Sequence, residues 1–71
     1  MSGLVKRSVA LAGHRTSIAL EAEFWAALAE CAKTRGMPLL ALIAAVDAER
    51  GAQQTLASAL RVFVLQNFST R

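Results

Sequence analysis

Cysteine is almost absent from this 71-residue sequence, which contains only Cys31. A lone cysteine forms no internal disulfide, and no histidine and cysteine cluster with ligand spacing accompanies it, so neither a metal nor another cofactor is expected. A chain this short buries little surface by itself and usually needs an additional source of stability. Association of identical chains is the remaining source, so we expect a homodimer or a higher oligomer.

Long apolar runs are also missing. The longest candidate, residues 38–46, is followed by Asp47 and falls well short of the roughly 18 residues that a membrane-spanning helix needs. The basic start of the chain is followed by a mixed segment, residues 8–13, rather than by the apolar core of a signal peptide. We therefore expect a cytoplasmic protein with no membrane partner.

Acidic residues are missing from the first fifteen positions, which carry Lys6, Arg7 and Arg15. From residue 16 onward five basic residues balance five acidic ones, so the whole net charge of +3 arises from the N-terminal segment. A dimer would gather six such charges, which suits a polyanionic partner such as nucleic acid. A solvated basic arm over residues 1–13 is the alternative interpretation.

Alternating residues predict a short amphipathic strand at positions 15–20. One side of it carries Thr16, Ile18 and Leu20, and the other carries Arg15, Ser17 and Ala19. Residues 7–11 alternate similarly, and Ala12-Gly13 could turn the chain between the two segments, although this dipeptide is a weak turn signal. The sequence leaves open whether residues 7–11 form an extra strand.

Three helices are predicted after the strand. Phe24, Leu28 and Cys31 recur at helical spacing in residues 21–35, and Gly36 supplies a C-terminal stop. A second helix is expected over residues 38–50, with Pro38 suited to its first position. Its apolar face consists of Leu39, Leu42, Ile43 and Val46.

The third helix is expected from Leu56 to about Asn67, with Thr55 as its N-cap. Its apolar stripe consists of Leu60, Phe63, Val64 and Phe68, with Val62 and Leu65 outside the stripe. A helix that is apolar around most of its circumference needs more cover than one short chain provides, which again indicates an intersubunit surface. We find no internal repeat, low-complexity tract or linker, and residues 1–71 are interpreted as a single domain.

Few residues suggest chemistry. Trp25 is interpreted as packing rather than as a platform for bases, and Cys31 as a buried, inert thiol. Cys31 and His14 are the only nucleophile and base that the sequence offers, and no third group that would orient them is evident, so no enzyme is expected. His14 either closes a turn or titrates beside Arg15.

The order of basic strand, helix, glycine and helix resembles the ribbon-helix-helix DNA-binding superfamily. The resemblance is carried by residues 15–20, 24–28 and 36–43. Residues 6–9, 13–18, 47–50 and 58–65 further resemble an uncharacterised bacterial subfamily, so the likeness spans residues 6–68. It implies a mainly α fold with one N-terminal strand that pairs antiparallel across a homodimer, plus a third C-terminal helix.

The resemblance also implies DNA-binding residues. Arg15, Ser17 and Ala19 would face the major groove, and Arg15 is the best base reader because its guanidinium can pair with guanine O6 and N7. The backbone amides of Leu39 and Leu40 would clamp a phosphate, but Pro38 replaces the usual hydroxyl residue and Leu40 stands where a polar one is common. Lys6 and Arg7 would compensate as a flexible arm that contacts phosphates.

A dimer core is implied as well. It would consist of Thr16, Ile18, Leu20, Phe24, Leu28, Leu42, Ile43 and Val46. The function expected from these residues is sequence-specific binding of double-stranded DNA by a dimeric β-ribbon, as a transcriptional regulator. The alternative is a protein-interaction or antitoxin-type module, whose ribbon mainly dimerises and whose third helix recruits a protein partner.

Overall fold

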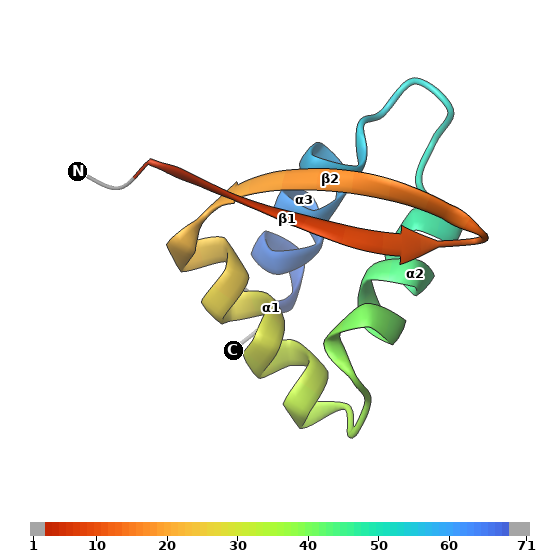
Figure 1. The fold of residues 1–71 in the computed structure, drawn as a ribbon. Helices are drawn as coiled ribbons and strands as arrows, with labels where there is room; N and C mark the ends of the chain where they lie inside the picture. The colour runs from red at the N-terminus through yellow and green to blue at the C-terminus, as the bar shows by residue number, and fades with distance from the viewer. Residues whose placement is uncertain (1–2, 69–71) are drawn as a thin grey trace.

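The chain folds as a β-hairpin that lies across three helices (Figure 1). The computed structural model describes residues 3–68. The elements are β1 (Leu4–Leu11), β2 (His14–Glu21), α1 (Ala22–Thr34), α2 (Leu39–Glu49) and α3 (Leu56–Phe68). This order confirms the expected mainly helical fold with a ribbon and a third helix. Within residues 3–68, no helix is both long and apolar enough to cross a membrane.

The ribbon is formed inside one chain. β1 pairs antiparallel with β2 over the whole length of both strands, from Leu4 opposite Glu21 to Leu11 opposite His14. Residues 4–11 are therefore a strand rather than a loose basic arm, because β2 supplies hydrogen-bonding partners along one edge of this segment. Residues 1–2 of the expected arm lie outside the described residues. A second chain was expected to supply the strand that pairs with β2. On this edge of β2, the pairing strand is instead β1 of the same chain.

The hairpin turn places both of its central residues in the left-handed region. Ala12 has φ of 50° and Gly13 has φ of 82°. Positive φ at both positions is the type I′ geometry that matches the twist of the flanking strands. Glycine adopts this conformation without strain, whereas the Cβ of alanine is crowded against the backbone. Ala12 is therefore the strained position of the turn.

Replacing Ala12 with asparagine should stabilise the fold by about 1 kcal/mol, because asparagine tolerates the left-handed region and Asn-Gly is a favoured type I′ turn. The urea midpoint of unfolding should rise with an unchanged slope. Gly13→Ala is the matched control and should lower the midpoint, although nothing lies within 4 Å of the added Cβ. If the urea midpoint of Ala12→Asn were at or below that of the parent chain, Ala12 would not be a strained position.

Helix ends follow the sequence signals closely. α1 ends at a Schellman motif, in which the N–H of Gly36 donates to Lys33 O (3.1 Å) and that of Met37 to Ala32 O (3.0 Å). Gly36 has φ of 68°, which confirms it as the stop. Pro38 lies one position before its expected place, at the N-cap of α2. The Oγ1 of Thr55 accepts a hydrogen bond from the N–H of Ser58 (3.1 Å), which confirms the cap of α3.

The core is closed within a single chain, because α3 packs against α1, α2 and β2 together. Leu60, in the middle of α3, is fully buried, and Val64 follows it one turn later. The cluster of buried residues consists of Leu11, Ile18, Leu20, Trp25, Leu28, Cys31, Ala32, Leu42, Ile43, Leu60 and Val64. Trp25 and Cys31 are thus buried as expected, and the side chain of Phe68 lies outside the description.

Candidate nucleic-acid interface

The face of the hairpin that points away from the helices carries small and cationic side chains. Directly opposed residues share a face of an antiparallel pair, and successive residues alternate between faces. The outer face is therefore made up of the pairs Lys6 and Ala19, Ser8 and Ser17, and Ala10 and Arg15, and the same alternation adds Leu4 and Glu21 at the open end of the hairpin. The six residues of the first three pairs are exposed except the partly buried Ala19, and none of these six is acidic. These three pairs, the central part of the outer face, are positively charged and carry no bulky apolar group, whereas Leu4 at the open end is 59% exposed.

The predicted groove residues all lie on this outer face. Arg15 and Ser17 are exposed, and Ala19 is partly buried. The alternation predicted from the sequence is also correct for the inner face, since Ile18 and Leu20 are buried against the helices. Lys6 and Ser8 of β1 join the same outer face through their cross-strand pairing. Sequence reasoning missed Ser8, because its position opposite Ser17 depends on the hairpin register.

Arg7 was expected to act with Lys6, but the two residues lie on opposite faces of β1. The guanidinium of Arg7 stacks over the indole of Trp25, with its carbon 4.5 Å from the ring centroid. The indole Nε1 of Trp25 donates a hydrogen bond to the carbonyl oxygen of Val5 (2.8 Å). These contacts attach β1 to α1, so the expected flexible arm of Lys6 and Arg7 is corrected to an anchored strand.

The hairpin contains one acidic residue, Glu21, at the end of β2. Arg61 of α3 donates to its Oε1 from Nε (3.1 Å) and Nη2 (2.9 Å). The same guanidinium lies over the ring of Phe24, 5.6 Å from the centroid. The carboxylate accepts a hydrogen bond from the backbone N–H of Glu21 itself and another from Arg61, and both lower the pKa of this carboxyl below its ordinary 4.5. Arg61 thereby compensates the negative charge at the open end of the outer face.

The Glu21 carboxylate should make stability depend on pH. Because its pKa is lowered in the folded state, its contribution is present above the ordinary value of 4.5 and is lost as pH falls through the folded value. Glu21→Gln should therefore unfold at a lower urea concentration than the parent chain at about pH 7, and this difference should shrink as pH falls below 4.5 and vanish once the folded carboxyl is protonated. A difference of equal size at both pH values would assign the effect to something other than this charge.

The expected phosphate clamp, formed by the backbone amides of Leu39 and Leu40, does not lie beside the outer face of the same chain. α1 leads away from the hairpin, and α2 returns toward it (Figure 1). The C-terminal end of α2 reaches the hairpin turn, where Asp47 and Arg50 line the same hollow as Leu11 and His14. The eleven residues of α2 span about 16 Å, so the amides of Leu39 and Leu40 lie at the distant end.

The residues expected in a dimer core are mostly buried inside the single chain. Leu20 and Leu28 are fully buried, and Ile18, Leu42 and Ile43 are at most 2% exposed. Thr16, Phe24 and Val46 keep partial exposure. The chain covers this set by itself because α3 adds Leu60 and Val64 to it. Only the three partly exposed members retain surface for a second copy.

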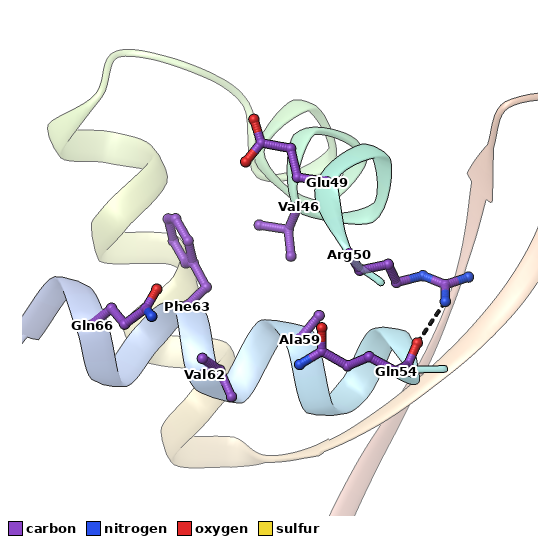
Figure 2. A pocket seen from close by; sticks show the side chains of 8 residues that line it. All are labelled: Val46, Glu49, Arg50, Gln54, Ala59, Val62, Phe63 and Gln66. Carbon is purple, nitrogen blue, oxygen red and sulfur yellow. Dashed lines mark hydrogen bonds between the residues drawn. The ribbon is translucent and has the colours of Figure 1, made fainter. Parts of the chain in front are cut away.

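The hollows of the described residues are small and open. The one between α2 and α3 holds about 160 Å³ and is lined by Val46, Glu49, Arg50, Gln54, Ala59, Val62, Phe63 and Gln66 (Figure 2). Arg50 is held there by the Gln54 carbonyl oxygen (2.6 Å) and by Asp47 (2.7 Å).

Cys31 and His14 line two different hollows, so the structure does not assemble them as a pair. No metal-binding group of His, Cys, Asp and Glu occurs in residues 3–68.

Comparison with known proteins identifies the family of the chain. The model of a family described as "Ribbon-helix-helix domain" matches residues 4–68, which is nearly the whole chain and includes both strands. No curated protein and no solved structure matches the sequence.

Proposed function

Because the chain belongs to the ribbon-helix-helix family, whose domains are generally non-enzymatic DNA-binding transcription regulators, we propose that it binds double-stranded DNA. Binding is sequence-specific, uses the outer face of the hairpin, and serves to regulate bacterial transcription in the cytoplasm. The observation that carries this proposal is the central part of the outer face, formed by its three pairs from Lys6 and Ala19 to Ala10 and Arg15. It is exposed except at Ala19, contains two cations and two hydroxyl groups, and includes no acid.

The side chains of the outer face suit the edges of base pairs. Arg15 pairs bidentately with O6 and N7 of guanine, which is worth about 1–3 kcal/mol of discrimination. Ser17 donates to or accepts from several bases and therefore specifies less. Ala19 offers a methyl contact to thymine and leaves room for longer neighbours. Lys6 adds a second cation to the same face.

A homodimer is the proposed binding species. The single chain leaves large apolar side chains exposed on its helices: Leu40 is 46% exposed, Val62 40% and Leu65 64%. Burying such groups against a second copy would supply apolar contact that a chain of 71 residues lacks. Sedimentation equilibrium should give twice the mass of the chain, and a purely monomeric chain at about 10 μM or above would contradict dimerisation.

A salt titration of duplex binding tests the DNA proposal. Each phosphate neutralised by a cation contributes about −0.9 to the slope of log affinity against log salt. Lys6 and Arg15 of two chains make four cations, so we expect a slope between about −2 and −4. Absence of binding at low salt, or a slope near zero, would contradict a DNA interface on this face.

Recruitment of a protein partner by α3 is the second candidate function. The adjacent exposure of Val62 and Leu65 on α3 favours it, because this pair lies one turn apart on the helix surface. A partner captured by the chain should stay bound when Arg7 and Arg15 are both neutralised, and should be released by Val62→Ser with Leu65→Ser. Release by the arginine changes instead would make the capture depend on nucleic acid.

A further inference from the structure

The two strands of the hairpin carry the same short sequence twice. Residues 6–11 read Lys-Arg-Ser-Val-Ala-Leu, and residues 15–20 read Arg-Thr-Ser-Ile-Ala-Leu. Serine, alanine and leucine are identical in the two copies, the first residue of each is a cation, and the fourth is β-branched. A six-residue match is too short to stand out in the sequence, from which no internal repeat was predicted. The strand pairing corrects that prediction, because it sets the two copies against each other.

The register relates the two copies by a local two-fold axis. Ser8 pairs with Ser17, so the equivalent serines of the two copies face each other. One step outward on either side, Lys6 pairs with Ala19 and Arg15 pairs with Ala10. A rotation about an axis between the two serines therefore exchanges Lys6 with Arg15 and one alanine with the other. The outer face of a single chain thus has approximate two-fold symmetry.

The pairing geometry brings the equivalent side chains close together. In a hairpin closed by a two-residue loop, the closing pair, here Leu11 and His14, is of the hydrogen-bonded type, and the pair types alternate from there. The outer-face pairs are consequently of the non-hydrogen-bonded type, with Cα atoms about 4.5 Å apart. A base edge within reach of Ser17 is therefore within reach of Ser8. Each long cation lies beside an alanine, which leaves it space.

The hairpin also has the width that a groove accepts. The major groove is about 12 Å wide and admits a two-stranded ribbon. A second β2 strand added to the open edge of β2 would create a four-stranded sheet, whose three spacings span about 14 Å. β1 is kept in its own chain by the hydrogen bond that Trp25 Nε1 donates to the carbonyl oxygen of Val5 and by the stacking of Arg7 on that indole. The two-stranded unit that fits is therefore the intrachain hairpin.

We propose that the hairpin of one chain is a complete reading ribbon, whose local two-fold axis coincides with the centre of a short, nearly palindromic duplex element. Lys6 and Arg15 read equivalent positions on the two sides of that centre, and Ser8 and Ser17 read the base pairs nearest to it. Ser8 and Lys6 are thereby specificity-determining residues. This inference rests on the proposed DNA binding and replaces the expected cross-chain ribbon, so that a dimer presents two such hairpins.

Selection of duplexes from a random pool tests the inference when it is applied to the parent chain and to four alanine variants. Ser8→Ala and Ser17→Ala should relax preference at base pairs next to the centre of the selected element. Lys6→Ala and Arg15→Ala should relax it at positions equally distant on opposite sides. Each cation variant should bind the selected duplex about fivefold or more weakly, with a smaller loss on random duplex. Thr34→Ala, exposed on α1, is the control and should select the parent element.

The outcomes separate the two proposals. If the parent chain selects an element that changes with Ser17 and Arg15 but not with Ser8 and Lys6, DNA binding stands and the intrachain ribbon is overturned. If the parent chain selects no duplex, the proposed function fails, and the inference fails with it. Far-ultraviolet circular dichroism should give the same spectrum for every variant as for the parent chain, as expected if these exposed substitutions leave the fold intact.

Discussion

Leu60→Ala should destabilise the folded chain by about 2–5 kcal/mol, the range measured when a buried leucine is truncated and its cavity does not collapse. Leu60 is fully buried and belongs to the cluster that joins all three helices to β2. The total stability expected for a domain of this size is roughly 4–10 kcal/mol, so this one change removes a large part of it. Urea unfolding followed by circular dichroism measures the loss.

Two further substitutions keep that prediction testable if Leu60→Ala does not fold. Leu60→Met conserves volume and should cost less than about 1.5 kcal/mol. Leu65→Ala removes the same side chain from a position that is 64% exposed, and should change stability by less than about 0.5 kcal/mol in the monomer. Equal losses at positions 60 and 65 would show that α3 does not close the core in the manner described.

Arg15→Ala should weaken binding to a selected duplex by about fivefold to 150-fold, which corresponds to the 1–3 kcal/mol of a bidentate contact to guanine. Random duplex should lose less, because it lacks the guanine that the guanidinium recognises. Arg15→Lys should also lose selectivity, since an ammonium keeps the charge but not the planar fork. Fluorescence anisotropy with both duplexes measures the two affinities.

Lys33→Ala is the charge-matched control for Arg15. It removes one positive charge from the last turn of α1, away from the hairpin. It should change the affinity for either duplex by less than about twofold at physiological salt. If Arg15→Ala lowers the affinity for selected and random duplex equally, Arg15 contacts phosphate, and base recognition belongs to other residues of the outer face.

Local patterns in the sequence predicted the structure correctly wherever a particular residue type strongly favours one backbone conformation or one side-chain environment. Gly36 was predicted as a stop because only glycine enters the left-handed region freely, and the structure places it there. Thr55 was predicted as a cap because its hydroxyl can accept from an unbonded amide, and it does. The alternation around Ile18 predicted the buried and exposed faces of β2 because side chains of a strand alternate.

The contacts between distant segments were not predictable in the same way. Glu21 and Arg61 are separated by 40 positions, and no local pattern indicates that α3 brings them within hydrogen-bonding distance. Arg7 carries the same charge as its neighbour Lys6, but side chains alternate along β1, so Arg7 lies on the opposite face and stacks on Trp25. The partial separation of the expected DNA residues, with Leu39 and Leu40 at the far end of α2, likewise follows from the path of the chain.

By itself the sequence determined the order of ribbon and helices, the ends of the helices, the inner and outer faces of β2 and the N-terminal concentration of positive charge. These properties depend on side-chain periodicity and on the backbone preferences of single residues. Only the tertiary structure decided that β1 pairs with β2 in the same chain, that α3 closes the core, and that Ser8 lies opposite Ser17. The register of a hairpin is fixed by a turn and by burial against the helices, and neither is a local property of the two strands.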